Sequence, residues 1–325
     1  MMKLGFMGTP AISAGLLKAL IEAGHEIAFV VSNPDRPKGR SGTPVPSAVS
    51  EVALREALPL FRPEKPAESL AEIREMDVDA VVVFAYGSIL PDGFLTLGRF
   101  GIFNLHGSLL PLLRGASPIQ SAILQGFAST GWTFQFVSQK MDCGDIVSEV
   151  ELEIDPEETA GELTDRMVPA GIQLVLGTLG ELEGLASRAR PQDPEKATYC
   201  KKILPNDSYL DWNRSALELH NQIRGMNPRP VARTMLGESL FKIHRSRVAE
   251  ITGSDLDEKQ LMARAPGDLL SWKRNGSPGL YVVTGKGVIE ILQLQPQNKK
   301  TMDAASFLNG YKLQPNARFE LPVEN

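Results

Sequence analysis

The first 31 residues contain the pattern that most constrains the fold of this chain. Residues 3–7 and 27–31 are apolar runs of strand length, and residues 11–23 between them place apolar side chains three and four apart. That spacing predicts an amphipathic helix between two buried strands. Such an order indicates a parallel βαβ unit, because parallel neighbours need a crossover connection. The chain is therefore expected to begin as an α/β protein.

The same alternation continues along more than half of the sequence. Further strands are predicted at 78–85, 101–106, 131–137 and 146–154, and helices at 118–125 and 159–185. Buried strands that alternate with helices predict a doubly wound α/β sheet. Ligands of such sheets bind beyond the carboxyl ends of the strands, so we expect the site to follow these strands directly.

A second domain is expected after this sheet. The chain has 325 residues, and a single hydrophobic core stops growing at roughly 250–300 residues. Residues 190–206 are rich in proline and polar residues, which is typical of a linker. Beyond it, a helix is predicted at 215–225, followed by short apolar runs that predict a small β-barrel, at 240–243, 280–283 and 288–294.

Composition narrows the class of protein. The two cysteines, Cys143 and Cys200, are too few for a disulfide framework. The four histidines lack the spacing of a zinc site, so no metal is expected. No apolar run approaches the roughly 18 residues that span a bilayer, and the first residues do not form an export signal. We therefore expect a soluble, cytoplasmic protein with no membrane partner.

Charge is divided unevenly along the chain. Residues 1–205 contain 18 Lys and Arg against 26 Asp and Glu, whereas residues 206–325 contain 16 against 13. One stretch of the second part holds a single acid, Glu238, among the basic residues Arg224, Arg229, Arg233, Lys242, Arg245 and Arg247. This local field could attract phosphates, and a solvated basic face is the alternative.

Two polar residues mark the end of one predicted strand. The period of two along a strand puts Asn104 and His106 on one face, and Phe103 and Leu105 on the other. A carboxamide beside an imidazole can hydrogen-bond the oxygen that becomes negative when an amine attacks an acyl carbon. Histidine can also move a proton. The alternative for this segment alone is a buried histidine satisfied by a structural asparagine.

The neighbouring loops add to this candidate site. Residues 107–115 combine two glycines, a proline and an arginine, as is typical of a shaped loop at a site. Asp142 lies in a predicted turn where it could orient His106, although acids in turns are more often structural. Residues 86–91 could bind a flat heterocycle through free backbone groups, or form a plain strand-to-helix turn. The basic, Pro- and Gly-rich loop 33–44 is predicted to be exposed and to contact phosphate, with a solvated loop as the alternative.

Three other kinds of site are excluded by local sequence. Ser108 lacks the Gly-x-Ser-x-Gly spacing of a hydrolase nucleophile. Residues 5–10 lack the Gly-x-Gly-x-x-Gly pattern of a dinucleotide loop and an acid placed for a ribose. Cys143 has acidic neighbours that disfavour its thiolate. We therefore expect neither a serine hydrolase, nor a nicotinamide enzyme, nor a cysteine nucleophile.

Taken together, the motifs resemble those of the methionyl-tRNA formyltransferase family. The resemblance rests on Phe-x-Gly-Thr-Pro at 6–10, Pro-Asp-Arg-Pro at 34–37, Ala-Tyr-Gly-x-Ile-Leu-Pro at 85–91 and Asn-x-His-Gly-Ser-Leu-Leu-Pro at 104–111. It continues through Arg-Gly-Ala at 114–116, the turn at 142–145, Arg-x-x-Asn-Pro at 224–228 and Leu-Gln-Pro at 294–296. The motifs match in order and spacing over the whole chain.

This resemblance implies a fold and a set of residue roles. It implies a Rossmann-like domain at 1–189 that binds 10-formyltetrahydrofolate, a linker at 190–209, and an OB-like β-barrel at 210–325 that contacts tRNA. The implied catalytic residues are Asn104, His106 and Asp142. The implied folate-binding residues are Tyr86, Gly87, Ile89, Leu90, Ser108, Leu109, Leu110 and Pro111. The tRNA-binding residues are expected to be Arg36, Lys38 and Arg40, with Arg224 and Arg229 in the second domain.

The resemblance also implies a reaction. The methionine α-amine of charged initiator tRNA would attack the formyl carbon on N10 of the folate, with the developing oxyanion held by Asn104 and His106. Asp142 would position His106 and help to remove the amine proton. An α-amine titrates near ~8, so a positioned base raises its reactive fraction at neutral pH. The resemblance further implies a monomer.

Two alternatives remain open from the sequence. A related formyltransferase that acts on the amine of a nucleotide sugar would share Asn-x-His and the Asp142 turn, but the basic second domain favours tRNA. A catalytically silent folate- or RNA-binding protein is motivated by departures from the family pattern after Arg40 and at residues 136–141. Retention of all three catalytic side chains favours an enzyme.

Overall fold

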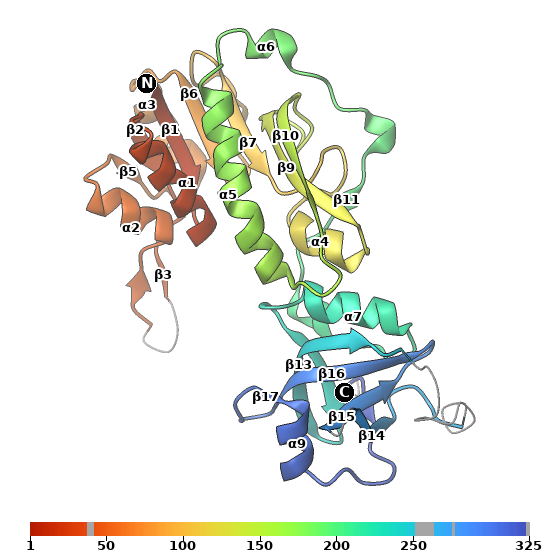
Figure 1. Cartoon of the computed structure of the whole chain (residues 1–325). Helices are drawn as coiled ribbons and strands as arrows, with labels where there is room; N and C mark the ends of the chain where they lie inside the picture. The colour runs from red at the N-terminus through yellow and green to blue at the C-terminus, as the bar shows by residue number, and fades with distance from the viewer. Residues whose placement is uncertain (38–41, 251–262, 275–276, 323–325) are drawn as a thin grey trace. The chain divides into compact units, whose positions relative to one another are not determined.

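The computed structural model of the chain describes residues 1–37, 42–250, 263–274 and 277–322, and the chain divides into two compact units (Figure 1). Unit 1 comprises Met1–Pro118, Ser129–Leu152 and Asp165–Lys201. Unit 2 comprises Ile119–Ala128, Glu153–Thr164 and Lys202–Asn325. No helix among the described residues is long and apolar enough to cross a bilayer.

Unit 1 is built on a seven-stranded sheet of order β10-β9-β7-β6-β1-β2-β5. Its strands are β1 (Lys3–Gly8), β2 (Glu26–Val31), β5 (Leu60–Phe61), β6 (Ala80–Phe84), β7 (Ile102–His106), β9 (Ser129–Phe136) and β10 (Ile146–Glu153). The five strands from β7 to β5 run parallel to one another. Strand β9 runs antiparallel to β7, so the predicted parallel sheet carries a mixed edge.

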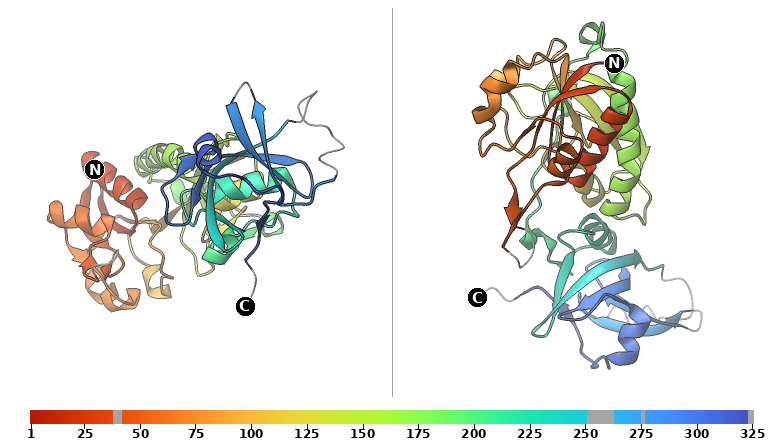
Figure 2. Two further views of the ribbon diagram at one scale, coloured as in Figure 1. Left: turned by 90° about the horizontal axis from the view of Figure 1, so that it is seen from below. Right: turned by 90° about the vertical axis from the view of Figure 1, so that its left-hand side faces the viewer.

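Helices cover both faces of this sheet. They are α1 (Ala11–Glu22), α2 (Ala48–Arg55), α3 (Leu70–Arg74), α5 (Ala160–Leu179) and α6 (Leu185–Arg188). Helices α1 and α5 lie side by side on one face (Figures 1 and 2). On that face the Trp132 indole donates to the Met167 carbonyl of α5 at 2.6 Å. On the other face Ile73 of α3 joins the core formed by Met7, Phe29 and Val81. The predicted doubly wound α/β arrangement is confirmed.

Short elements complete unit 1. They are β3 (Arg36–Pro37), β4 (Pro44–Val45), β8 (Arg114–Gly115), β11 (Tyr199–Cys200) and the 3₁₀ turns Pro66–Ser69, Asp92–Phe94 and Pro194–Lys196. Strand β11 pairs in parallel with β8, within the segment that the sequence indicated as a linker. The long helix predicted at 159–185 ends at Leu179. It ends there because Gly180 follows and Gly184 adopts a left-handed φ of 91°, which a continuing helix does not permit.

The order of the parallel strands fixes where a ligand can bind. Chain connections reverse direction between the neighbouring strands β1 and β6, and the crevice of a doubly wound sheet lies at such a point. The loops that leave the carboxyl ends of β1, β6 and β7 begin at Thr9, Ala85 and Gly107. These loops carry the motifs selected from the sequence, so the fold brings them to one edge.

Unit 2 is an antiparallel sheet of order β14-β15-β16-β13-β12-β18, with β17 paired to β16. The strands are β12 (Ala232–Leu236), β13 (Ser239–Val248), β14 (Leu269–Arg274), β15 (Ser277–Val283), β16 (Val288–Pro296), β17 (Met302–Asp303) and β18 (Phe319–Glu320). A bridge between Asp268 and Arg318 joins the two outer strands at one end, with Arg318 Nε 2.7 Å from Asp268 Oδ1. The sheet is therefore curled into a half-barrel.

Among the described residues, three helices and a 3₁₀ turn belong wholly or largely to unit 2: α4 (Pro118–Leu124), α7 (Ala216–Gly225), α9 (Ala304–Gly310) and the turn Pro205–Ser208. Helix α7 confirms the prediction at 215–225. It starts at a capping box in which Ser215 and Glu218 satisfy each other's backbone N–H. Leu219 and Ile223 of α7 are fully buried in the core of the curled sheet. The Trp212 indole donates to Thr234 Oγ1 at 2.9 Å in the same core.

Candidate active site

Asn104 and His106 lie at the carboxyl end of β7, on the same face of the strand. Asn104 is paired with Val83 of β6 and with Gln135 of β9, and His106 is paired with Thr133. Within the described part of the chain, the Asn104 carboxamide makes no hydrogen bond. It is half-buried. A rigid strand therefore presents an amide whose donors and acceptor are available to a ligand.

The two ring nitrogens of His106 have different neighbours. The side chain is 6% exposed, and Nε2 lies 3.0 Å from the carbonyl oxygen of Leu113. A carbonyl only accepts, so Nε2 carries a proton in this arrangement. Nδ1 faces Asp142, with 3.6 Å between Nδ1 and Oδ1. Nδ1 is consequently the ring atom that can take up or release a proton, and it does so beside a carboxylate.

Asp142 is held in place through its carboxylate. The backbone N–H of Gly115 donates to Oδ2 at 2.9 Å, and Gln135 Nε2 lies 3.4 Å from Oδ1. The turn depends on close backbone contacts, because a Cβ at Gly144 would lie 1.8 Å from the Phe136 carbonyl oxygen. The turn is thus shaped to aim one carboxylate oxygen at His106.

Some of the strained backbone positions of the chain lie around this site. Ala85, Leu113 and Asp142 are non-glycine residues with positive φ, at 48°, 55° and 54°. Such conformations cost of order ~1–3 kcal/mol each and persist where the surrounding structure imposes them. Leu113 offers its carbonyl to His106, and Asp142 offers its carboxylate. Two of these strained positions therefore present polar groups to His106.

The loop after β7 is shaped by its own side chains. Ser108 is buried and its hydroxyl donates to the Leu112 carbonyl at 2.6 Å. The Leu110 N–H donates to Thr133 Oγ1 at 3.0 Å. Residues 109–112 line a cavity of about 620 Å³, which does not include Asn104, His106 or Asp142 in its lining. Ser108 thus stabilises the loop, and the partly exposed side chains of Leu109, Pro111 and Leu112 remain as contact surface.

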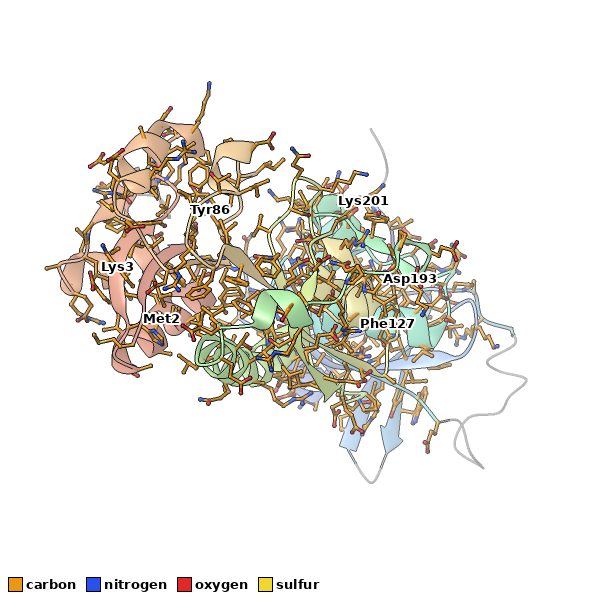
Figure 3. The ribbon with its side chains drawn as sticks, turned by 90° about the horizontal axis from the view of Figure 1, so that it is seen from above. Met2, Lys3, Tyr86, Phe127, Asp193 and Lys201 are labelled. Atoms are coloured by element: carbon orange, nitrogen blue, oxygen red, sulfur yellow. The ribbon has the colours of Figure 1, made fainter. Side chains whose placement is uncertain are left out.

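The turn after β6 leaves polar backbone groups free. Within the described part of the chain, the N–H and C=O groups of residues 87–90 make no hydrogen bond. Ile89 is 77% exposed, whereas Leu90 packs against the core. Tyr86, labelled in Figure 3, is buried, and its hydroxyl has no hydrogen-bond partner among the described residues. Burial raises the pKa of Tyr86 to about 12. Gly87, with a φ of 85°, lets the chain turn at this point.

The basic residues selected from the sequence have different environments. Arg36 is exposed and pairs with Glu64 at 3.0 Å, while Lys38 and Arg40 lie outside the described residues. Arg229 is exposed and has no partner within the described chain. Arg224 is 6% exposed, and its NH1 donates to two backbone carbonyls of unit 2 at 3.1 and 3.2 Å. Its guanidinium is therefore engaged inside the unit.

Sequence reasoning missed two residues of the site, Gln135 and Gln192. Gln135 lies beside Asp142, and Gln192 donates to the backbone carbonyls on both sides of the turn. Nothing in the local sequence distinguishes Gln192 from the polar residues around it. No group of three His, Cys, Asp or Glu residues in the described ranges could hold a metal ion.

Comparison with known proteins places the chain in a family. The formyl transferase family model matches residues 2–179, and the model of the formyl transferase C-terminal domain matches residues 202–312. A methionyl-tRNA formyltransferase of Leptospira interrogans serovar copenhageni (strain Fiocruz L1-130) is 42% identical over 98% of this chain and 100% of its own length. The chain belongs to the methionyl-tRNA formyltransferase family. The family member of Bacillus subtilis (strain 168) is 38% identical over 95% of each chain.

Solved structures agree with this assignment at the level of the fold. The N-formyltransferase from Helicobacter canadensis, crystallised with folinic acid and dTDP-3-aminofucose, has a TM-score of 0.63 with 17% identity. The match covers 90% of this chain and 99% of that chain. This chain therefore shares its fold with that more distant N-formyltransferase.

Proposed function

We propose that this chain transfers the formyl group of 10-formyltetrahydrofolate to the α-amino group of methionyl-initiator tRNA, for translation initiation. The observation that carries the proposal is the assembly of Asn104, His106 and Asp142 at one sheet edge, in a chain that is 42% identical to a methionyl-tRNA formyltransferase. The two chains align over nearly their full lengths, so the comparison covers both units.

The residues around the site fit a folate. A pterin presents donors and acceptors along one edge of a flat ring, and the free N–H and C=O groups of residues 87–90 offer complementary partners. Tyr86 and Gly87 shape this turn, Ile89 and Leu90 add apolar surface, and the loop from Ser108 to Pro111 would form a second wall through Leu109 and Leu110. The folate supplies the activated formyl carbon.

Asn104 is proposed to stabilise the developing charge. When the amine attacks, the formyl oxygen becomes an oxyanion, and the available Asn104 amide can donate to it from a fixed strand. His106 adds a positive charge nearby once it is protonated. Fixed donors of this kind need no reorganisation during the reaction, which is why removal of one typically costs about two to three decades of kcat.

His106 and Asp142 are proposed to handle the proton. The attacking α-amine must lose a proton when its nitrogen bonds to the formyl carbon, and Nδ1 of His106 can accept it beside the Asp142 carboxylate. When the bond between N10 and the formyl carbon breaks, N10 takes up a proton, which His106 can return. Asp142 stabilises the imidazolium between these two steps, and Leu113 holds the ring through Nε2.

The second unit is proposed to contact tRNA. We assign residues 1–189 to the folate-binding transferase domain, 190–209 to a linker and 210–325 to an OB-like barrel, which the curled antiparallel sheet supports. Arg229 is exposed and free to meet phosphate, and Arg36 can leave its surface ion pair at little cost, because such pairs contribute about 0–1 kcal/mol. Lys38 and Arg40 are proposed to extend the same contact. Arg224, although part of the basic stretch, is proposed to support the fold.

The experiment that tests the function compares three acceptors. Methionyl-initiator tRNA, free methionine and an amino-sugar nucleotide are each incubated with 10-formyltetrahydrofolate, and formyl transfer is measured. Formylation of the charged tRNA alone is expected. Transfer to the sugar nucleotide would replace the proposal with a sugar formyltransferase, and folate binding without any transfer would make the chain a binding protein. We propose that the protein works as a monomer in the cytoplasm, where initiator tRNA is charged.

A further inference from the structure

We infer that Gln192 is a positioning residue that fixes the Asp142 turn against the Arg114 loop, and that turnover depends on this contact. The inference rests on the proposed function, in which Asp142 acts with His106. Gln192 does not touch the reacting groups. It lies 50 residues beyond Asp142 in the chain and donates a hydrogen bond to the Asp142 backbone carbonyl.

The Gln192 amide joins two loops through both of its ends. Its Nε2 lies 2.9 Å from the Asp142 carbonyl oxygen, 2.7 Å from the Gly144 carbonyl oxygen and 3.0 Å from Gln135 Oε1. Its Oε1 accepts from Arg114 Nε at 3.0 Å and from Arg114 NH2 at 2.7 Å. A single side chain therefore closes the turn on one side and binds the buried guanidinium on the other.

The hydrogen-bonding groups around position 192 limit which side chain can satisfy them. Arginine has donors only, and backbone carbonyls have acceptors only, so the residue between them must accept at one end and donate at the other. The amide of Gln does both, with its donor and acceptor ends fixed in different directions. These contacts also fix the orientation of the amide, because the reversed amide would place NH₂ against the Arg114 donors.

The contact reaches Asp142 along two routes. The first is direct, through the Asp142 backbone carbonyl, which restrains a residue held at a φ of 54°. The second runs through Gln135, which accepts from Gln192 and lies 3.4 Å from Asp142 Oδ1 through its own Nε2. Hydrogen bonds in such chains polarise one another and strengthen. The Arg114 charge thus polarises the hydrogen bonds that lead to the Asp142 carboxylate, although the two groups form no direct ion pair.

The neighbouring backbone strengthens the case. Gly115, directly after Arg114, donates its N–H to Asp142 Oδ2. The guanidinium and the next N–H of the same loop therefore hold the turn from two directions, one through Gln192 and one directly. If Gln192 is lost, the carboxylate keeps its contacts with Gly115 and Gln135, but the Asp142 carbonyl and Gln135 lose the amide that holds them. The turn is then free to relax away from His106. A shift of about 1 Å at such a group can cost on the order of 10²-fold in rate.

The test uses two substitutions at one position. Gln192→Met keeps the length and removes both polar ends, whereas Gln192→Glu keeps the acceptors for Arg114 and removes the donors to the turn. Both are expected to lower kcat for formylation of methionyl-initiator tRNA by about 10- to 100-fold, as losses of outer hydrogen-bonding partners commonly do. KM for each substrate should stay within about twofold. Wild-type turnover by Gln192→Glu would overturn the inference.

A matched control exists in unit 2. Gln222 is 6% exposed, donates to the Asp207 and Tyr209 carbonyls at 3.0 Å each, and accepts from Arg214 NH1 at 3.3 Å. Gln222→Met removes the same kinds of hydrogen bond away from the catalytic residues. It is expected to lower the melting temperature about as much as Gln192→Met while leaving kcat within about twofold. Equal kcat losses in the two variants would reduce Gln192 to a structural role and overturn the inference.

Two further measurements separate positioning from general destabilisation. In an Asp142→Asn background, Gln192→Met should change kcat by less than about threefold, because it acts through Asp142; a full second loss would contradict that route. The second readout needs no activity. Amide hydrogen exchange at Gly115, whose N–H binds the Asp142 carboxylate, should accelerate at least tenfold in Gln192→Met and stay unchanged in Gln222→Met. Unchanged exchange at Gly115 in Gln192→Met would overturn the inference, whether or not the wild-type protein is active. Failure of the wild-type protein to formylate any of the three acceptors would refute only the proposed function.

Discussion

Replacing Asp142 with asparagine removes the negative charge beside His106 and changes the size of the side chain little. The remaining amide oxygen can still accept from the Gly115 N–H, so the turn should keep its main anchor. The new NH₂ group would face Gln135 Nε2 or His106, neither of which replaces the attraction of a carboxylate for an imidazolium. The variant therefore tests charge rather than shape.

The distance between His106 and Asp142 determines the expected loss of kcat. His106 Nδ1 and Asp142 Oδ1 are 3.6 Å apart, and the side chains are 6% and 12% exposed. Two unit charges at that separation, with an effective dielectric constant of about 20, attract each other by about 4 to 5 kcal/mol. If that attraction exists only when His106 has taken the amine proton, its loss corresponds to about three decades of kcat. This value falls inside the two to four decades expected for acid–base residues.

The assay is the initial rate of formylation of methionyl-initiator tRNA with 10-formyltetrahydrofolate at saturating concentrations of both. His106→Ala should give a loss of about two to four decades in the same assay. Asp145→Asn is the matched control, since Asp145 is an exposed acid three positions further along the same turn, and its kcat should stay near wild type. Turnover of Asp142→Asn within threefold of wild type would refute the charge argument, and so would an equal loss in Asp145→Asn.

Three further outcomes follow from the structure. Gly144→Ala should lower the free energy of unfolding by about 1–3 kcal/mol, because its Cβ would lie 1.8 Å from the Phe136 carbonyl oxygen. Gly177→Ala, in open space on α5, should raise that free energy by roughly 0.5–1 kcal/mol. Urea denaturation that ranks the two variants the other way would contradict the packing. Arg229→Ala should weaken tRNA binding at every tRNA sequence and reduce the slope of log K against log salt by about 1, and an unchanged slope would exclude a phosphate contact. Burial raises the pKa of Tyr86 to about 12 from 10, so this group's contribution to stability is complete below about pH 10 and is lost as pH rises through 12. Tyr86→Phe should flatten that alkaline decline in the free energy of unfolding, and an identical decline in both proteins would disprove the role of Tyr86.

The sequence predicted the elements whose pattern is long and regular. Strands β1, β6 and β7 lie where apolar runs predicted them, and α1 and α7 where apolar spacing did. The candidate site was selected by the same reasoning, because the period of two along β7 predicted Asn104 and His106 on one face. The resemblance to the family then connected that strand with Asp142. The structure brings His106 and Asp142 to 3.6 Å, although 36 positions separate them in the printed sequence.

Other features depended on contacts that no local pattern encodes. The short elements α3 and β5 contain too few residues for a period to be recognised. The burial of Arg224 depends on carbonyl groups of residues 155 and 158, which lie far from it in the sequence, so its charge alone indicated a surface residue. Gln192 was missed for the same reason, since its partners belong to the loops at 114 and 142–144.

The pairing of β11 with β8 determines where the chain can be truncated without disturbing unit 1. Thr198 N donates to the Pro111 carbonyl, the Arg114 N–H donates to the Thr198 carbonyl, and the Thr198 hydroxyl accepts from the Leu113 N–H. A fragment that stops at residue 189 would keep Asn104, His106 and Asp142, the proposed catalytic residues, and still lose the strand that braces the loop after β7. The smallest fragment that retains unit 1 intact must extend through Lys201. Any chimera that exchanges the C-terminal half for that of another formyltransferase should accordingly place its junction after that residue.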